Sequence, residues 1–224
     1  GAAHEAVDRL VEGLAHDVPA SHFDDGNAAH HDFAAAAEVV FARRGFDDAT
    51  MQEIAREAGC ATGTLYLYFK NKEELFRAIL DRRSAEFYPL LIRAMQETRD
   101  PVEKIRRNTA ALLNYFNAHW SVFRLFYSAA PGGRALLSSS LQGFALREYL
   151  AFKETELAIL EQAQSARKIR TDMPAAELIE FMHGVTLSTL ARWSLQEPRP
   201  TQDEQLRLLW GFLSAALGAK GRRR

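Results

Sequence analysis

Apolar residues recur every three or four positions along most of the chain, which is the pattern of amphipathic helices. No alternation of apolar and polar residues predicts a strand, and no segment of the chain repeats. We therefore predict an all-α fold, with helices at residues 5–16, 31–44, 51–58, 62–69, 72–98, 102–117, 119–129, 134–166, 174–196 and 202–218.

Capping residues mark several of these helix boundaries. Thr50 followed by Glu53 has the pattern of a capping box, in which each side chain satisfies a backbone N–H of the other residue. Asn71 with Glu74 marks a second helix start in the same way. Gly45 suits the left-handed residue that ends a helix, so the helix before it is expected to stop there.

The two helices on either side of Gly59 are short and joined by a tight turn, as in a helix-turn-helix unit. In such a unit the second helix enters the major groove of DNA. Its outward residues carry no charge, and hydroxyls, a glycine and aromatic rings suit base edges, thymine methyls and phosphate oxygens. These residues are Thr62, Gly63, Thr64, Tyr66, Leu67 and Tyr68.

Residues 33–80 resemble the DNA-binding domain of the TetR family. The segment covers about a fifth of the chain, and its elements are specific when taken together. They are an alanine-rich helix ending at Arg44-Gly45-Phe46, Thr50 with Ile54-Ala55, Ala58-Gly59, Gly63-Thr64-Leu65-Tyr66, Tyr68-Phe69, and Lys72-Glu73 with Leu75. One departure is Ala61, where the family often has a Ser or Thr that caps the second helix.

The resemblance implies a set of DNA contacts. In the family, the residue at the position of Thr50 binds phosphate at a helix N-terminus, and the one at the position of Gln52 faces the groove edge. Bases are read by the residues at four positions, here Thr62, Gly63, Thr64 and Tyr66. The DNA backbone is held by the residues at the positions of Tyr68 and Lys72.

The resemblance also implies a helical bundle that forms a homodimer. In the family the last two helices pair with their copies, here at 174–196 and 202–218, where Leu178, Phe181, Met182, Val185, Leu190, Leu206, Leu209, Trp210 and Leu213 give wide apolar faces. A two-fold dimer places two recognition helices about 34–36 Å apart, which suits a pseudo-palindromic operator on double-stranded DNA.

A ligand cavity between the middle helices is a further implication. Because this half of the chain is rich in aromatic residues, we expect a small apolar effector that shifts the population away from the DNA-binding arrangement. Most of the rings must also serve as bundle core. The candidate lining residues, with two histidines as polar groups, are Phe116, His119, Trp120, Phe123, Phe144, Phe152, Phe181 and His183.

These features divide the chain into four segments. Residues 1–30 form an N-terminal extension with a short amphipathic helix and a flexible linker, and 31–83 form the helix-turn-helix DNA-binding domain. Residues 84–218 form the helical ligand-binding and dimerisation domain, and 219–224 form a basic tail.

Charge and cysteine content limit how this protein can bind DNA and where it works. The net charge is −1, and residues 31–83 hold eight cations against nine acids, so few phosphate contacts and a shallow salt dependence are expected. Cys60 is the only cysteine, so no internal disulfide can form. With no export signal and no apolar run long enough to span a membrane, a cytoplasmic protein without membrane contact is expected.

Two other classes of protein remain as alternatives. One is an all-helical enzyme with the bundle cavity as its active site, although no catalytic motif is present and we expect no enzymatic activity. The other is an interaction protein with a degenerate DNA-binding domain, whose acidic extension covers the recognition surface. Most histidines lie in the first 31 residues, but their spacing matches no standard metal site, so neither a metal nor a cofactor is expected.

Overall fold

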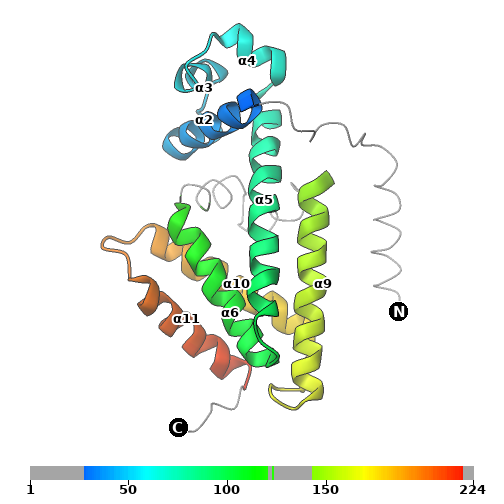
Figure 1. Ribbon diagram of the computed structural model, residues 1–224. Coiled ribbons are helices and arrows are strands. Elements are labelled where there is room, and N and C mark those ends of the chain that lie inside the picture. Colours follow the sequence, from blue (N-terminus) through cyan, green and yellow to red (C-terminus); the bar gives the residue numbers. More distant parts are fainter. Residues whose placement is uncertain (1–27, 121–122, 124–142, 219–224) are drawn as a thin grey trace.

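The computed structural model describes residues 28–120, 123 and 143–218. These residues form helices and no strand, which confirms the all-α class. The predicted helix at 5–16, most of the one at 119–129, the start of the one at 134–166 and the basic tail lie outside the described residues. The helices are α2 (Ala28–Arg44), α3 (Met51–Glu57), α4 (Thr62–Tyr68), α5 (Lys72–Gln96), α6 (Pro101–Ala118), α9 (Gly143–Ser165), α10 (Ala175–Ser194) and α11 (Gln202–Ala216) (Figure 1).

A small head at one end of the molecule is built from α2, α3, α4 and the first turns of α5 (Figure 1). Its core contains Ala37, Ile54, Leu65, Leu75 and Ile79, each fully buried. Burial of a side chain such as Leu or Ile contributes about 1.5–3 kcal/mol, so this core fixes the angle between the two short helices. Neither short helix would be stable in isolation at seven residues each.

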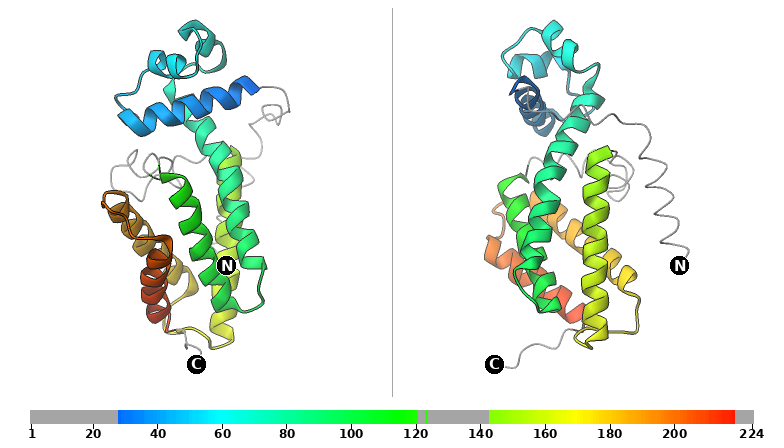
Figure 2. Two further views of the ribbon diagram at one scale, coloured as in Figure 1. Left: turned by 60° about the vertical axis from the view of Figure 1, so that its left-hand side comes forward. Right: turned by 45° about the vertical axis from the view of Figure 1, so that its right-hand side comes forward.

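The rest of α5 continues into a bundle with α6, α9, α10 and α11. Helix α5 packs against both α6 and α9, α11 packs against α6, and α10 contacts both α9 and α11 (Figure 2). The bundle core includes Leu91, Leu113, Leu160, Leu190 and Trp193, all essentially inaccessible to solvent. Because α5 belongs to both cores, the head and the bundle share one continuous helix.

The predicted caps are present. Glu53 donates its backbone N–H to Thr50 Oγ1 at 3.2 Å, and its carboxylate accepts from the Thr50 N–H at 3.2 Å. Asn71 Oδ1 accepts the Glu74 N–H at 2.9 Å, and Gly45 has the expected left-handed backbone, with φ of +83°. Ala61 makes no side-chain cap, as its sequence implied.

Helix α2 starts earlier than predicted. It begins at Ala28 rather than at residue 31, so the last three residues of the predicted linker are helical. The reason is local, because Ala28 and Ala29 have the highest helix propensity and no proline separates them from the following turn. The remainder of the predicted linker lies outside the described residues.

Candidate functional site

The outward surface of α4 is uncharged and exposed to solvent. Leu65 anchors the helix and is fully buried, whereas Tyr66 is 52% exposed and Leu67 is 82% exposed. At 100° per residue, Gly63 and Leu67 lie on the side of α4 opposite Leu65. The predicted recognition face is therefore available to a partner and is not part of the protein's own core.

Gly63 has no internal reason to be a glycine. It sits within α4 with ordinary helical backbone, and a Cβ added there would meet no atom within 4 Å. Packing within the protein therefore does not require the missing side chain, and its absence leaves the backbone of α4 open to close approach from outside.

The N-terminus of α3 presents two more of the predicted residues. Thr50 is exposed, and its hydroxyl both accepts from Glu53 N and lies 3.1 Å from Glu53 Oε2. This hydrogen bond with Thr50, with Arg44 nearby, holds the pKa of the Glu53 carboxyl below its ordinary value. Gln52, two residues further along the chain, is also exposed. Both belong to the N-terminal end of α3, the helix that packs directly against α4.

The ammonium of Lys72 is bound by the loop that precedes α3, a contact that the sequence did not predict. Its ammonium donates to the carbonyl oxygens of Phe46 at 2.8 Å, Asp47 at 2.7 Å and Ala49 at 3.5 Å. It also lies 4.8 Å from the centroid of the Phe46 ring. Two of the three ammonium protons are therefore engaged by close carbonyls, and the third contact is long. In this way Lys72 secures the loop that leads into α3.

Most arginines of the head are paired. Arg44 lies 3.1 Å from Glu53, and Arg43 is bonded to Glu57. Among the described residues of the head, no ionic partner is found for the side chains of Arg56, Lys70 and Arg77.

Tyr68 is 36% exposed, and the centroid of its ring lies 5.2 Å from that of the Phe33 ring, so only part of the side chain faces outward.

A buried ion-pair cluster joins the head to α5. Glu38 of α2 accepts from Arg82 Nη2 at 2.8 Å, and from Arg83 Nε at 3.0 Å and Nη2 at 2.8 Å. The Arg83 guanidinium also faces Tyr115 of α6, where burial raises the pKa of the tyrosine hydroxyl to about 12 and Arg83 opposes that rise. The cluster therefore links the head to the aromatic part of the bundle.

Several predicted effector residues lie together in a chain of ring contacts. Phe116 and Phe123 have ring centroids 5.0 Å apart, Trp120 and Phe123 5.7 Å apart, and His119 lies 4.7 Å from Tyr115. We call these five residues the aromatic cluster. Phe116 and Phe123 are buried, while His119 and Trp120 are partly exposed.

Phe152 and His183 form a second group next to it. Their rings stack at 6.3 Å with an interplanar angle of 11°. Phe87 and Tyr88, neighbours on α5, join the two groups, because Phe87 lies 5.3 Å from Phe116 and Tyr88 lies 5.5 Å from Phe152.

Phe181 is not part of either group, contrary to its predicted place in the cavity. Its side chain is 60% exposed on α10 and faces away from the aromatic rings. The helical period explains this, since Phe181 lies two positions, or about 200°, from the inward-facing His183. The side chain of Phe144 lies outside the described residues.

Several residues of this site were not predicted from the sequence. Phe87, Tyr88 and Tyr115 carry no distinguishing signal, because aromatic residues at helical spacing are equally consistent with core. Asn108 and Glu156 were missed because a single polar residue on a helix is normally solvated. In the structure both are buried, at 7% and 4% exposure, and Asn108 Nδ2 donates to Glu156 Oε1 at 2.8 Å. Nothing local in the sequence signals this contact across 48 positions.

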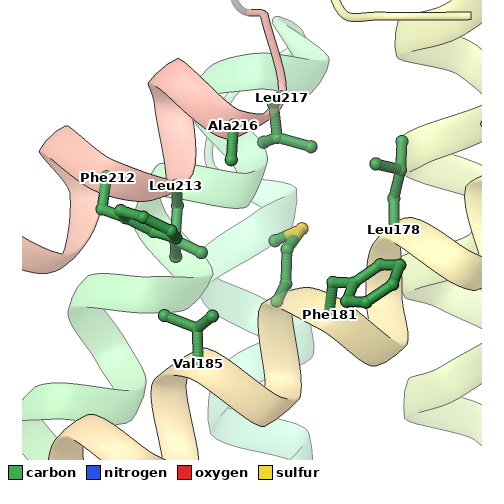
Figure 3. Close-up of a pocket in the computed structure, with 8 residues that line it drawn as sticks. Leu178, Phe181, Val185, Phe212, Leu213, Ala216 and Leu217 are labelled. Carbon is green, nitrogen blue, oxygen red and sulfur yellow. The ribbon is translucent and has the colours of Figure 1, made fainter.

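Helices α10 and α11 present an apolar face to solvent. Phe181 of α10 and Phe212 of α11 are 60% and 57% exposed, and Leu208 is 49% exposed. Figure 3 shows the side chains of both helices around a shared hollow. The hollow is lined by Leu178, Phe181, Met182, Val185, Phe212, Leu213, Ala216 and Leu217, all apolar. Contiguous exposed apolar surface of this kind marks an interaction site.

Residues 34–79 match the model of the family described as bacterial regulatory proteins, tetR family. A transcriptional repressor of the helix-turn-helix type from Streptomyces coelicolor, SCO4008, is 30% identical over 165 residues, covering 73% of this chain and 77% of the relative. Several other curated relatives match over shorter stretches, and the chain spans 22% to 38% of their own length.

Solved structures with the same fold include two regulators of fatty acid metabolism. The fatty acid degradation regulator FadR from Bacillus halodurans superposes with a TM-score of 0.73 at 18% identity, covering 88% of this chain and all of that one. FadR from Bacillus subtilis, in complex with stearoyl-CoA, gives a TM-score of 0.68 at 18% identity, covering 86% and 100%. In the described part of this chain no helix has the length and hydropathy needed to cross a membrane.

Proposed function

Because the chain belongs to the tetR family of bacterial regulatory proteins, we propose that it is a DNA-binding transcriptional repressor released from its operator by a small effector. The observation that carries the proposal is the exposed, uncharged face of α4 around Gly63 and Tyr66, because a glycine open to close approach is expected of a helix that lies in the major groove.

The residues of the head divide into two roles in this proposal. Thr62, Gly63, Thr64 and Tyr66 face base edges, with hydroxyl groups that can donate or accept and a glycine that allows close approach. The side chains beside them position the head on the DNA backbone and groove edge, namely Thr50, Gln52 and Tyr68. Lys72 contributes by fixing the loop before Thr50 and not by contacting phosphate.

The apolar face of α10 and α11 is the proposed dimer interface. A lone protomer would leave Phe181, Leu208 and Phe212 in water, and two-fold pairing would bury them on both copies at once. A dimer would also place two copies of α4 on successive turns of the same side of a DNA duplex.

The proposed effector site is the aromatic cluster with the adjoining rings of Phe152 and Tyr88. An apolar effector is supported by the character of these rings and by the relatives whose names refer to fatty acid metabolism. The Arg83 and Glu38 pair offers a route to the head, since Arg83 lies near Tyr115 of the cluster and is hydrogen-bonded to Glu38 of α2. Effector binding would then shift the population of head orientations.

The test is selection of bound DNA from a random duplex pool, followed by affinity measurements on the selected site. Tyr66→Phe and Thr62→Ala should change which bases are preferred, by about 1–3 kcal/mol at the affected positions. Thr171→Ala, at an exposed threonine between α9 and α10, is the matched control and should change nothing. A purified dimer that enriches no sequence would contradict the proposal.

A further inference from the structure

A polar cluster lies inside the bundle next to the proposed effector site. It consists of Asn108 on α6, Glu156 on α9 and His183 on α10. Asn108 Nδ2 donates to Glu156 Oε1 at 2.8 Å, and His183 Nε2 lies 2.9 Å from Glu156 Oε2. Only His183 reaches the surface, with 27% of its side chain exposed, whereas the Glu156 carboxylate is 4% exposed.

This polar cluster holds more hydrogen-bond acceptors than donors. A carboxylate offers about four lone-pair positions, and Glu156 receives one well-aligned hydrogen bond, from Asn108. Glu156 Oε2 and Asn108 Oδ1 are both fully buried and have no aligned donor among the described residues. No lysine or arginine of the described chain pairs with Glu156. A buried carboxylate with one aligned hydrogen bond, and with only a partly exposed histidine 2.9 Å from its second oxygen, is stabilised by a further donor or positive charge.

Two tyrosine rings lie near the same carboxylate. Tyr88 and Tyr149 have ring centroids 5.8 Å apart, and Phe152 links Tyr88 to His183. Burial, with the neighbouring Tyr149 and the Glu156 charge, raises the pKa of the Tyr88 hydroxyl well above its usual range. Ring faces beside a carboxylate attract cations, because the aromatic quadrupole and the carboxylate charge both favour a positive group.

We propose that the polar cluster of Asn108, Glu156 and His183 is the subsite for a positively charged or amine-bearing end of an otherwise apolar effector. An ammonium group has three donors and no acceptor, which complements Glu156 Oε2 and Asn108 Oδ1. The rings along Tyr88 and Phe116 then receive the apolar part of the same molecule. This inference rests on the proposed function and makes its effector class specific.

The polar cluster also argues against an anionic effector end at this position. A second carboxylate placed beside Glu156 would meet a like charge in a site of low dielectric constant, which is strongly unfavourable. The chain therefore differs in expected ligand preference from the structural relative that holds stearoyl-CoA, although the two share a fold. The structural alternative is that His183 alone balances Glu156 and no ligand is involved.

The experiment compares decylamine, decanol and decanoate, which share a chain length and differ only in the polar end. Binding to the full chain is measured by calorimetry, and release of the selected operator is measured separately. We expect decylamine to bind at least about 10-fold more tightly than decanol, from one charge-assisted hydrogen bond in a buried site, with decanoate the weakest.

Glu156→Gln should remove the preference for the amine while leaving decanol binding within about twofold. Glu154→Gln, an exposed carboxylate on the same helix, is the matched control and should retain the preference. If Glu156→Gln does not fold, the order of the binding affinities of the three probes for the unmodified chain tests the inference. Equal binding of the three probes, or a preference for decanoate, would overturn this inference while operator binding stood. Loss of operator binding in the unliganded chain would overturn the proposed function instead.

Discussion

Replacing Lys72 with methionine tests whether this residue holds the loop or the DNA. Methionine keeps most of the aliphatic stem, so the change removes the ammonium with little loss of packing. The ammonium makes two close bonds, at 2.8 and 2.7 Å, and a longer one at 3.5 Å. The two charge-assisted bonds and the cation–π contact stabilise the fold, and in the variant water can reach the exposed carbonyl of Asp47 and offset part of the loss. The net contribution of the ammonium to the free energy of unfolding is therefore about 2–3 kcal/mol.

We expect Lys72→Met to lower the free energy of urea unfolding by that amount. Operator affinity should fall for all sequences alike, because the loop that places Thr50 is loosened. Its dependence on salt should not change, since no phosphate contact is lost. A residue that bound phosphate would instead reduce the salt slope by about 1 in each head, with little effect on unfolding.

Lys70→Met is the matched control, two residues away. Among the residues that the structure describes, the Lys70 ammonium has no partner, although the Lys70 backbone N–H is bonded to Glu74. This variant should leave the unfolding free energy unchanged and reduce only the salt slope. A Lys72→Met protein of normal stability with a reduced salt slope would refute our assignment.

Three further substitutions test other parts of the structure. Phe212→Glu should dissociate the dimer, because it places a charge in the apolar interface, and light scattering would show a monomer; a persistent dimer would place the interface elsewhere. Arg83→Met should lower the unfolding free energy by about 3 kcal/mol, because it leaves Glu38 buried with Arg82 alone, and a loss under 1 kcal/mol would contradict a buried pair. Asp100→Asn keeps the α6 cap but loses the ion pair with Lys168, which holds the pKa of Asp100 below its ordinary value. That contribution is present at neutral pH and is lost as pH falls through the lowered pKa. The melting temperatures should therefore differ at pH 7 and converge once the pH is below that pKa; a difference independent of pH would exclude this pair.

The head could be predicted largely from its sequence because its boundaries are set by local chemistry. Thr50 with Glu53, Asn71, and the left-handed Gly45 and Gly59 each act within a few residues of themselves. What the sequence did not show was the direction of the Lys72 side chain. Its partners lie 23 to 26 positions away, so only the folded loop reveals them.

The bundle was less predictable because its important contacts join distant helices. An aromatic residue at helical spacing is equally consistent with core, interface and ligand site, and this is why Phe181 was placed in the cavity. Glu156 illustrates the opposite error. A glutamate on a helix is normally solvated, and its burial follows from the packing of α6, α9 and α10 around it.

The pairing of arginines within the head has a consequence for the speed of DNA association. Carboxylates neutralise Arg43, Arg44, Arg82 and Arg83, which leaves Arg56, Lys70 and Arg77 as the cations of the described head with no ionic partner. The described head therefore projects little positive potential into solvent. Encounter with a duplex would then lack long-range steering and proceed at about 10⁵–10⁷ M⁻¹s⁻¹ instead of near the diffusion limit. Such a protein would spend little time on unrelated DNA, since retention there depends on phosphate charge.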